Sequence, residues 1–568
     1  MHIQNALERG AKLIVVDPKR TEMAQKADLF LQIPPGYNIP TLNCIMNVII
    51  NEDLCNKEFL EKSTTGFEYL KMAVEPYSPE AVGKLTGVEP ELFVKAARMY
   101  AKNSPSAIIY AMGLTQFSSG TGNVWSVSNL AAITSNLGIE GAGVNPLRGQ
   151  NNVQGACMLG ALPTLLPSGK PVTNDEGRGA LEQLWNCKLP DKPGFVLTEA
   201  PQKMNEGKIK CLYIMGENPV VSDPWTDHFI HSLESLDFMI VQDIVLTQTA
   251  SYADVVLPAT CFAEKDGTFV NTSRRVQLVN KAVDPPGDAM GDMEILCQLA
   301  TNSGTKGFEY RNAEEVWDEI RQVNANQFGG MSFKRLRETN GLFAPCPDLD
   351  HPGTPCLYKG SIFNTPEKKA VLVPVVFTPE FSKREECAEI WKKKLCLPEG
   401  YPFTAGSIIE KISNDYPLIL TTGRYVYHYH TGTMTRLCAP LMNGADQHHH
   451  AVEINEGTAN RYELSEGDFV RIENKRGMIA TRVRIMDRIP KNTIFGTFHY
   501  WEANVNELTN ADHLDPISKI PELKISAVKL TKIPENEYIS ILKDKQIKYF
   551  PDTGVQSRGN INVPAGVI

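Results

Sequence analysis

The sequence predicts an α/β protein: two Rossmann-like αβα domains with mainly parallel sheets, followed by a C-terminal β-barrel. Up to about residue 305, short apolar strands alternate with helical patterns, which is typical of βα units around a parallel sheet. From Tyr416 onward, strands follow one another across short polar turns, which favours a small barrel. The chain has 568 residues. A single core holds ~250–300 residues, so several domains are expected.

Residues 1–150 form the first predicted αβα domain. Its strands are indicated by apolar runs that end in turn residues, and its helices by apolar stretches of helical period. The chain opens on the end of a helix that runs straight into a strand, so we expect an upstream part to be missing. The strands are "AKLIVVDP", "LFLQIPPG" and "SAIIYAMG", and the helices are "TLNCIMNVIINEDL", "PELFVKAARMYAK" and "NVWSVSNLAAITSNLG".

Residues 151–305 form the second predicted αβα domain, with a small β insertion near 263–291. Its strands are continuous runs of Val, Ile and Leu, as expected when both faces of a sheet are covered. These strands lie in "IKCLYIMGENP", "LDFMIVQDIVL" and "YADVVLPAT".

The rest of the chain divides into three segments. Proline and charged residues interrupt the rhythm in 306–410, which predicts a connector with peripheral helices. Residues 411–535 form the predicted barrel, in which "ENKRGM" is a hairpin signal. Residues 536–568 are expected to be a peripheral tail. The barrel strands lie in "PLILTTGRYVYHY", "DFVRIENKRGMIATRVRI" and "NTIFGTFHYW".

Composition excludes several classes of protein. The formal net charge of −9 gives no electrostatic basis for binding nucleic acid. No apolar run reaches the ~18 residues of a membrane-spanning helix, so no membrane insertion is expected. The twelve cysteines form no C-x-x-C pair, so no zinc or iron–sulfur ligand set is spelled out, and reduced thiols of a cytoplasmic protein are expected. Neither a dinucleotide-binding glycine fingerprint nor a phosphate-binding P-loop motif follows any strand.

Distinctive polar residues follow the predicted strands of both sheets. Ligands of open α/β sheets bind beyond the carboxyl ends of the strands, and two similar sets of acid, amide and glycine therefore indicate two nucleotide-like sites. Each residue taken alone also fits a helix cap or a turn. The first set is Asp17, Arg20, Gly36 and Gln116, and the second is Gly216, Glu217, Asn218, Gln242, Asp243 and Thr247.

The barrel region carries a run that suits a pyrophosphate, because imidazoles, hydroxyls and backbone N–H groups alternate along a predicted strand and into a turn. His428 and His430 are expected on one face of that strand, a spacing that also suits a metal ion. The consecutive residues His448, His449 and His450 fit a solvated loop better than a metal site. The run comprises Arg424, His428, His430, Thr431, Gly432 and Thr433.

The stretch "NPLRGQNNVQGACMLGALP", residues 145–163, places one arginine among glycines and amides. Glycine lets a backbone approach a ligand closely, and the planar guanidinium of Arg148 suits a carboxylate or a phosphate. From this stretch alone, a surface turn whose arginine pairs with an acid is the simpler interpretation.

Several motifs together resemble the catalytic subunit of molybdenum- or tungsten-dependent formate dehydrogenases, which belongs to the molybdopterin oxidoreductase superfamily. The resemblance runs from Met1 to about Lys529, and "NPLRGQNNVQG" points to the formate branch. The motifs are "VDPKRTE", "NPLRGQNNVQGACMLGALP", "MGENPVVSD", "VQDIVLTQTASYADVVLP", "GTFVNTSRRVQ" and "HYHTGTMTR".

The resemblance implies a molybdenum or tungsten centre bound by two molybdopterin guanine dinucleotides, together with a small N-terminal domain that carries a [4Fe-4S] cluster. It also implies that the cysteine or selenocysteine ligand of the metal lies upstream of Met1, so that no metal ligand is expected in this chain and the chain alone is expected to be inactive. Our hypothesis is that the chain starts at an internal Met after an in-frame selenocysteine codon, or that a separate polypeptide supplies the upstream segment.

The resemblance also implies a role for each candidate residue. Arg148 would orient formate, while Gly149, Gln150 and Gln116 would line the pterin. Asp17 and Arg20, with Gly36 nearby, would hold one guanine end, and the second set of strand-end residues would hold the other. Residues of the barrel would grip phosphates and pterin edges, namely Arg424, His428, His430, Thr431, Gly432, Asn506 and Lys524.

Three functions remain open from the sequence. The first is interconversion of formate and CO2, with electrons passed to iron–sulfur or flavin subunits linked to NAD, ferredoxin, coenzyme F420 or a hydrogenase. The second is nitrate reduction or another oxo-transfer on the same cofactor, although a fixed cation at Arg148 suits a carboxylate better. The third is a non-catalytic fragment without the metal ligand.

Overall fold

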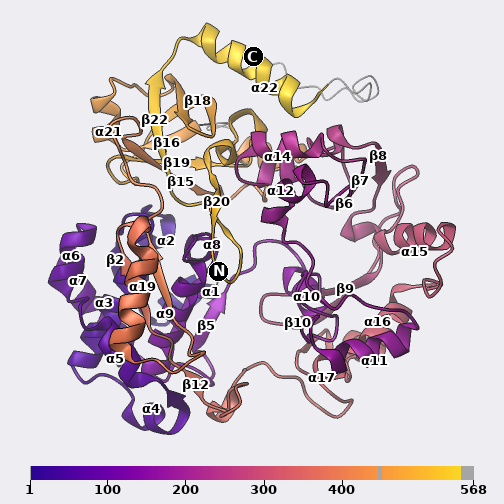
Figure 1. The fold of residues 1–568 in the computed structure, drawn as a ribbon, viewed down its shortest axis with the longest axis horizontal. Coiled ribbons are helices and arrows are strands. Elements are labelled where there is room, and N and C mark those ends of the chain that lie inside the picture. The colour runs from indigo at the N-terminus through magenta and orange to yellow at the C-terminus, as the bar shows by residue number, and fades with distance from the viewer. Residues whose placement is uncertain (1, 446–450, 552–568) are drawn as a thin grey trace.

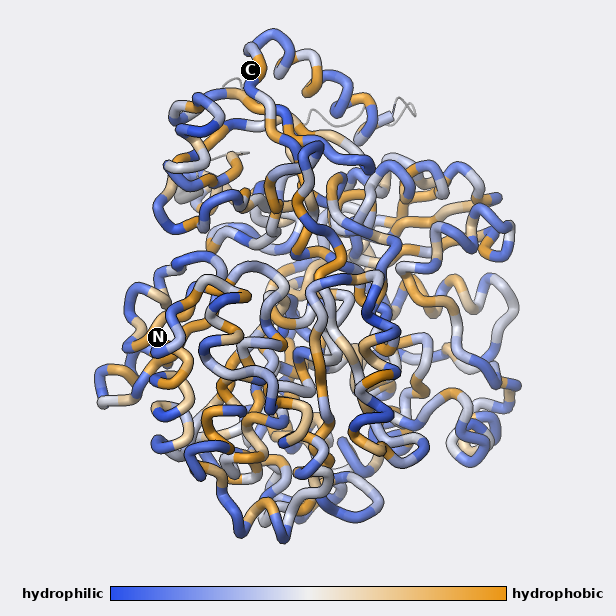
Figure 2. The backbone as a smooth tube through the Cα atoms, turned by 60° about the vertical axis from the view of Figure 1, so that its left-hand side comes forward, coloured by the Kyte–Doolittle hydropathy of each residue, from blue (hydrophilic) through white to orange (hydrophobic). Residues whose placement is uncertain are grey.

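The computed structural model describes residues 2–445 and 451–551, and the predicted fold class is confirmed (Figure 1). The barrel lies at the top of the view, the first αβα domain at the lower left and the second domain on the right. The expected histidine run 448–450 lies outside the described residues. Within the described residues no helix is long and apolar enough to cross a membrane. Hydrophobic residues instead occur in short stretches throughout the molecule (Figure 2).

The first domain contains two separate parallel strand pairs in place of the single sheet that was expected. Strand β1 (Ile14–Val16) pairs with β2 (Leu29–Leu31), and β4 (Ala107–Tyr110) pairs with β5 (Gly143–Pro146). The helices are α1 (His2–Glu8), α2 (Glu22–Gln25), α3 (Asn38–Asn51), α4 (Lys57–Ser63), α5 (Phe67–Val74), α6 (Pro79–Thr86), α7 (Pro90–Lys102), α8 (Met112–Thr115) and α9 (Gly120–Ile133).

Helix α3 is the core element of the first domain. Its apolar residues, among them Met46 and Ile49, are fully buried, and each such side chain contributes roughly 1.5–3 kcal/mol relative to an exposed one. Its buried amides have partners as well, because Asn47 Nδ2 donates to the Val74 carbonyl at 3.1 Å and a buried polar group without a partner is costly.

The expectation of a mere connector is wrong for the second half of 306–410, which completes the first domain. Strand β12 (Ala370–Val371) pairs with β3 (Thr64–Thr65), β13 (Val375–Thr378) pairs in parallel with β14 (Thr404–Ser407), and α19 (Arg384–Leu395) packs beside α5 (Figure 1). Asn43 Nδ2 donates to the Val375 carbonyl at 2.8 Å. The strands are only two to four residues long, which is too short for a periodic signal.

The second domain has a parallel sheet in the order β6-β7-β8 and a separate antiparallel sheet in the order β9-β10-β11. The expected β insertion corresponds to β9 and β10. The strands are β6 (Cys211–Met215), β7 (Phe238–Asp243), β8 (Val255–Pro258), β9 (Gly267–Val270), β10 (Arg275–Val279) and β11 (Leu342–Phe343). The helices are α10 (Val153–Met158), α11 (Asp175–Trp185), α12 (Ala200–Asn205), α13 (Pro219–Ser222), α14 (Thr226–Leu233), α15 (Asp292–Asn302), α16 (Ala313–Val323), α17 (Ala325–Phe328) and α18 (Phe333–Thr339).

The barrel closes in the order β15-β19-β16-β18-β17-β22, and its inward apolar residues form one core that includes Leu420, Val470 and Ile494. The expected hairpin is confirmed, because Asn474 pairs with Gly477 across a two-residue turn. The strands are β15 (Leu418–Gly423), β16 (Ala451–Ile454), β17 (Phe469–Asn474), β18 (Gly477–Ile485), β19 (Thr493–Thr497) and β22 (Ser526–Lys532), flanked by β20 (Asn510–Leu514), β21 (Pro521–Glu522), α20 (Ala439–Ala445) and α21 (Glu456–Arg461).

The segment expected to be a peripheral tail includes a helix that joins the barrel to the second domain. Helix α22 (Glu535–Tyr549) buries Tyr549 completely, and the Tyr549 hydroxyl donates to Glu507 Oε1 at 2.9 Å. Lys545 Nζ forms a buried ion pair with Glu507 and donates to the Met478 carbonyl at 2.7 Å. Lys548 contacts both Glu507 and Asp227 of α14.

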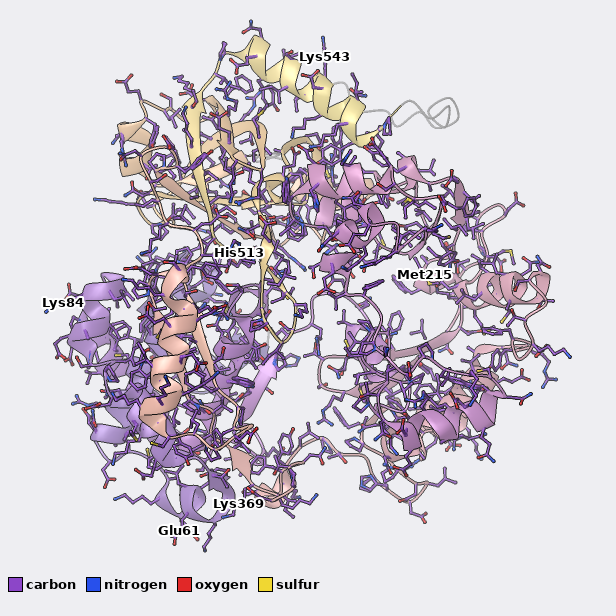
Figure 3. All side chains as sticks on the ribbon, in the orientation of Figure 1. Glu61, Lys84, Met215, Lys369, His513 and Lys543 are labelled. Atoms are coloured by element: carbon purple, nitrogen blue, oxygen red, sulfur yellow. The ribbon has the colours of Figure 1, made fainter. Side chains whose placement is uncertain are left out.

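Replacing Lys545 by Met is expected to lower the free energy of unfolding by about 3 kcal/mol, because it removes one partner of a buried ion pair. Lys543→Met is the matched control on the same helix, since the Lys543 side chain lies at the exposed surface (Figure 3), and it should change stability by about 0.5 kcal/mol or less. Chemical denaturation of both variants measures this. Equal stability of the two would contradict a structural role for α22.

Candidate functional site

The loop after β1 lies against the barrel. Lys19 Nζ is 2.7 Å from Glu453 Oε2 in β16 and 3.7 Å from the centre of the Phe495 ring in β19. The Arg20 backbone N–H donates to the Arg488 carbonyl at 2.9 Å, while the Arg20 side chain is exposed. This buried ion pair fixes the strand end that carries Asp17 in front of the barrel.

Arg424, Lys524 and Asp17 form the cationic cluster of the site. Lys524 is buried, and Lys524 Nζ donates to the Thr422 carbonyl at 2.8 Å. Burial, with the nearby charge of Arg424, lowers the pKa of Lys524 to about 8, although Asp17 opposes the shift. Burial also raises the pKa of Asp17. Two cations thus lie close enough to disfavour each other's charge, and the Asp17 carboxylate lies near Lys524, an arrangement that an additional anionic group such as a phosphate would stabilise.

The histidines of the barrel do not share a strand face as expected. Strand β15 ends at Gly423, and the following residues form turns in which His430 adopts a left-handed backbone conformation with φ of 49°. His428 is buried, and its Nδ1 lies 3.1 Å from Thr435 Oγ1. The alternating polar pattern of this run reflects a tight loop, in which Thr431 and Thr433 hydroxyls lie 2.8 Å apart and Gly432 packs against His499 and Arg436.

His499 is a site residue that the sequence did not single out. It lies just beyond β19 and is fully buried, its Nε2 accepts from the Tyr425 backbone N–H at 2.9 Å, and its Nδ1 contacts the His430 carbonyl oxygen. These partners assign a neutral ring with the proton on Nδ1. Burial lowers the pKa of His499 and that of His430 to about 4, and the charge of Arg424 adds to both shifts.

The loop of Arg148 lies beside the cationic cluster. A Cβ at Gly149 would lie 2.9 Å from Arg424 Nη1, so the lack of a side chain at this position leaves room for the Arg424 guanidinium. The Arg148 backbone N–H donates to Thr272 Oγ1 at 3.1 Å, and its side chain is exposed. Within the described residues the Arg148 guanidinium has no ion-pair partner, so the surface-turn interpretation, which requires a paired acid, is not supported.

Two carboxylates stand at the ends of neighbouring strands in the second domain. Glu217 follows β6 and Asp243 ends β7, and burial together with neighbouring acids raises the pKa of each. Gly216 has φ of 63°, and the space where its Cβ would lie is open. Carboxylates at strand ends next to open space are suited to accept hydrogen bonds from the N–H or O–H groups of a ligand.

Other candidate residues have side chains that are engaged within the protein. Asn218 bonds Gln248 and Thr249, Gln242 donates to Asp292 at 2.6 Å, Thr247 Oγ1 accepts from the Ala250 N–H at 3.1 Å, and Asn506 Nδ2 donates to the carbonyls of Val221 and Ser222 at 3.0 and 2.9 Å. Gly36 packs against Ile408 and Ile525, and the Gln116 carbonyl accepts from Leu523. These residues shape the loops, and Asn506 joins the barrel to the second domain. Gln150 is half-buried in the Arg148 loop.

Comparison with known proteins identifies the family. Residues 1–302 match the molybdopterin oxidoreductase profile and residues 418–527 match the molydopterin dinucleotide binding domain. The chain belongs to the molybdopterin oxidoreductase family. It is 45% identical to the F420-dependent formate dehydrogenase subunit alpha of Methanocaldococcus jannaschii, over 94% of this chain and 74% of that protein.

Two further comparisons give one more distant relative and one similar fold. The assimilatory nitrate reductase catalytic subunit of Bacillus subtilis is 34% identical over 94% of this chain and 72% of its own length. The structure of acetylene hydratase from Pelobacter acetylenicus superimposes with a TM-score of 0.70 at 20% identity, over 94% of this chain and 75% of that one. The latter similarity concerns the fold.

The site fits the molybdopterin dinucleotide that the family implies. The cationic cluster of Arg424, Lys524 and Asp17 suits phosphate groups, and the carboxylates of Glu217 and Asp243 suit donor groups of a base or a sugar. Within the described residues, no three or more His, Cys, Asp or Glu side chains are grouped so that they could hold a metal ion.

The contribution of His499 to the free energy of unfolding should depend on pH. Its pKa is about 4 in the folded protein, against about 6.5 in an unfolded chain. Between these values the unfolded chain binds more protons, so this residue lowers stability as the pH falls, by up to about 3 kcal/mol at pH 4.

The difference in unfolding free energy between wild type and His499→Asn, followed from pH 7 to pH 4, measures this contribution. We expect wild type to lose its advantage over the variant across that range. The exposed His231 provides the control, as His231→Asn should keep the wild-type slope. A pH-independent difference for His499→Asn would show that His499 is not held neutral.

Proposed function

We propose that this chain is the cofactor-binding and substrate-binding part of a formate dehydrogenase catalytic subunit, and that Arg148 binds formate. The observation that carries the proposal is the Arg148 guanidinium, which is exposed and has no ion-pair partner within the described residues, on a loop packed against Arg424. The higher identity to the formate dehydrogenase subunit alpha, 45% against 34% for the nitrate reductase subunit, supports formate over nitrate.

In this proposal, formate is oxidised to CO2 with release of one proton and two electrons, and the bound metal–pterin cofactor supplies the two-electron chemistry. Arg148 holds the carboxylate of formate by two parallel hydrogen bonds, which fixes its orientation. Arg424 adds positive potential beside this carboxylate. The neutral rings of His430 and His499 add no further charge near neutral pH, so the potential is set by the two arginines and Lys524.

The cofactor would be held at both ends by residues of this chain. Arg424 and Lys524 would bind its phosphates, with Asp17 and Arg20 near one guanine end. Glu217 and Asp243 would accept from the other guanine end, because a carboxylate can take two donors of one base edge. The metal would be molybdenum or tungsten, with a cysteine or selenocysteine ligand.

The electron path is proposed by analogy with the relatives. The relative from Methanocaldococcus jannaschii is subunit alpha of an F420-dependent formate dehydrogenase, which implies additional subunits. We propose that a [4Fe-4S] cluster and an iron–sulfur or flavin partner subunit carry the electrons from the cofactor to coenzyme F420, in a cytoplasmic assembly. Dye reduction with formate and dye oxidation with nitrate, both measured on the holoenzyme isolated with its partner subunits, distinguish formate chemistry from oxo-transfer.

Arg148→Lys in the holoenzyme should lower kcat/KM for formate by roughly 100-fold or more while the cofactor content is unchanged, because lysine keeps the charge and loses the two-donor fork. Arg311→Lys, at an exposed surface position, should leave turnover at the wild-type value. Steady-state kinetics with an artificial dye and metal analysis provide the two measurements. Wild-type kcat/KM in Arg148→Lys would refute the assignment.

A further inference from the structure

We propose that the β9–β10 hairpin holds the Arg148 loop in place and that Thr272, in the hairpin turn, is a positioning residue for Arg148. This inference rests on the proposed function only in its kinetic consequence, because the hydrogen bonds themselves are features of the fold. Thr272 does not face the reacting atoms and acts through the backbone of Arg148.

Two hydrogen bonds from the hairpin bracket the glycine-containing part of the loop. At one end, the Arg148 backbone N–H donates to Thr272 Oγ1 at 3.1 Å. At the other end, Asn152 Oδ1 accepts from the Val270 backbone N–H at 2.9 Å. Only residues 149–151 lie between the two anchors. The hairpin therefore fixes both ends of the segment that places the guanidinium.

The geometry at Asn152 is adapted to this contact. Asn152 has φ of 59°, a left-handed conformation that asparagine tolerates better than most residues, and it directly precedes α10. A Cβ at Gly155 would lie 2.2 Å from Asn152 Oδ1 and 3.1 Å from Val270 Cγ2. A glycine at 155 is thus what lets the Asn152 amide reach β9.

The conformation of the hairpin turn is fixed by hydrogen bonds that do not involve the Arg148 loop. Asn271 Oδ1 accepts from the Arg275 backbone N–H at 3.0 Å and from Ser273 Oγ at 2.8 Å, and the Arg274 N–H donates to the Asn271 carbonyl at 2.8 Å. Arg274 Nη2 in turn donates to the Thr354 carbonyl at 3.1 Å. These bonds use Asn271 and Arg274 and leave the Thr272 hydroxyl for Arg148.

A dedicated core supports the hairpin. Val270 and Val276 pair across β9 and β10, and both are buried with Trp317 and Phe328 from α16 and α17. Trp317 Nε1 donates to the Met331 carbonyl at 2.5 Å. Residues that the sequence predicted to be part of a connector thus build a rigid base for the hairpin, and through it for the Arg148 loop.

The barrel contacts the loop as well. Burial raises the pKa of Tyr429, and the nearby backbone of Asn151 opposes this shift. Arg424 lies against Gly149. The loop is therefore held between the hairpin and the barrel, and loss of the hairpin contact should loosen the position of Arg148 without unfolding either part.

The test is a Thr272→Val substitution in the holoenzyme, which keeps the shape of the side chain and removes the hydroxyl acceptor. Thr272→Ser restores the acceptor. Thr268→Val is the matched control, because it makes the same Thr-to-Val change in β9 of the same hairpin, opposite Leu278 and outside the turn that contacts the loop. Two quantities are measured for each variant: amide hydrogen exchange of the peptide spanning 147–152, and kcat/KM for formate.

In Thr272→Val we expect exchange of the peptide to accelerate about tenfold and kcat/KM for formate to fall about tenfold, since small displacements of a positioning group cost up to ~100-fold in rate. The cofactor content should remain that of wild type. Thr272→Ser should return both quantities to within about twofold of wild type, and Thr268→Val should leave both unchanged.

Unchanged exchange in Thr272→Val would overturn the inference whatever the reaction. Faster exchange with wild-type kcat/KM, in an enzyme whose Arg148→Lys variant is impaired, would overturn the positioning role. Failure of Arg148→Lys to impair formate turnover would instead refute the proposed function, and the exchange data would still decide whether the hairpin holds the loop.

Discussion

The half-buried guanidinium of Arg424 is the constraint on which the rest of the site depends. It stands directly after β15, lies 5.6 Å from the centre of the Phe498 ring, and has the backbone of Gly149 against it. Within the described residues no carboxylate forms an ion pair with it. A partly desolvated cation of this kind is stabilised when an anion approaches it, and this is the physical basis of the proposed phosphate binding at Arg424.

The site separates its charges between two places. Cations gather where the barrel faces the first domain, and the carboxylates of Glu217 and Asp243 stand at the strand ends of the second domain. A ligand that carries phosphates and hydrogen-bond donors at different ends is therefore held in one direction only. The charges of Arg424 and Glu217 both affect the pKa of Tyr429. The barrel loop that carries Tyr429 therefore lies between the cations and the carboxylates.

The sequence was informative wherever a continuous apolar run ended in polar residues, which is why Asp17, Glu217 and Asp243 could be placed at strand ends in advance. It was uninformative where contacts join distant segments. The closure of the first domain by β12–β14 depends on strands too short to show a period. His499 is recognisable only from the partners that fold against it, and the burial of Tyr549 depends on the second domain. Strand β15 ends earlier than the sequence predicted. The residues that follow it alternate in polarity as a strand would, but they form a loop.

The central claim is that Arg424 and Lys524 bind the phosphates of the cofactor. The most direct test is the number of protons that the protein takes up when a phosphate-bearing ligand binds. The pKa of Lys524 is about 8, and a bound anion would raise it. Guanosine diphosphate, as the phosphate-bearing part of the cofactor, should therefore cause net proton uptake of up to about half a proton when it binds the cofactor-free protein at pH 8, and this uptake should vanish in Lys524→Met. Binding without proton uptake, or equal uptake in wild type and Lys524→Met, would contradict the account.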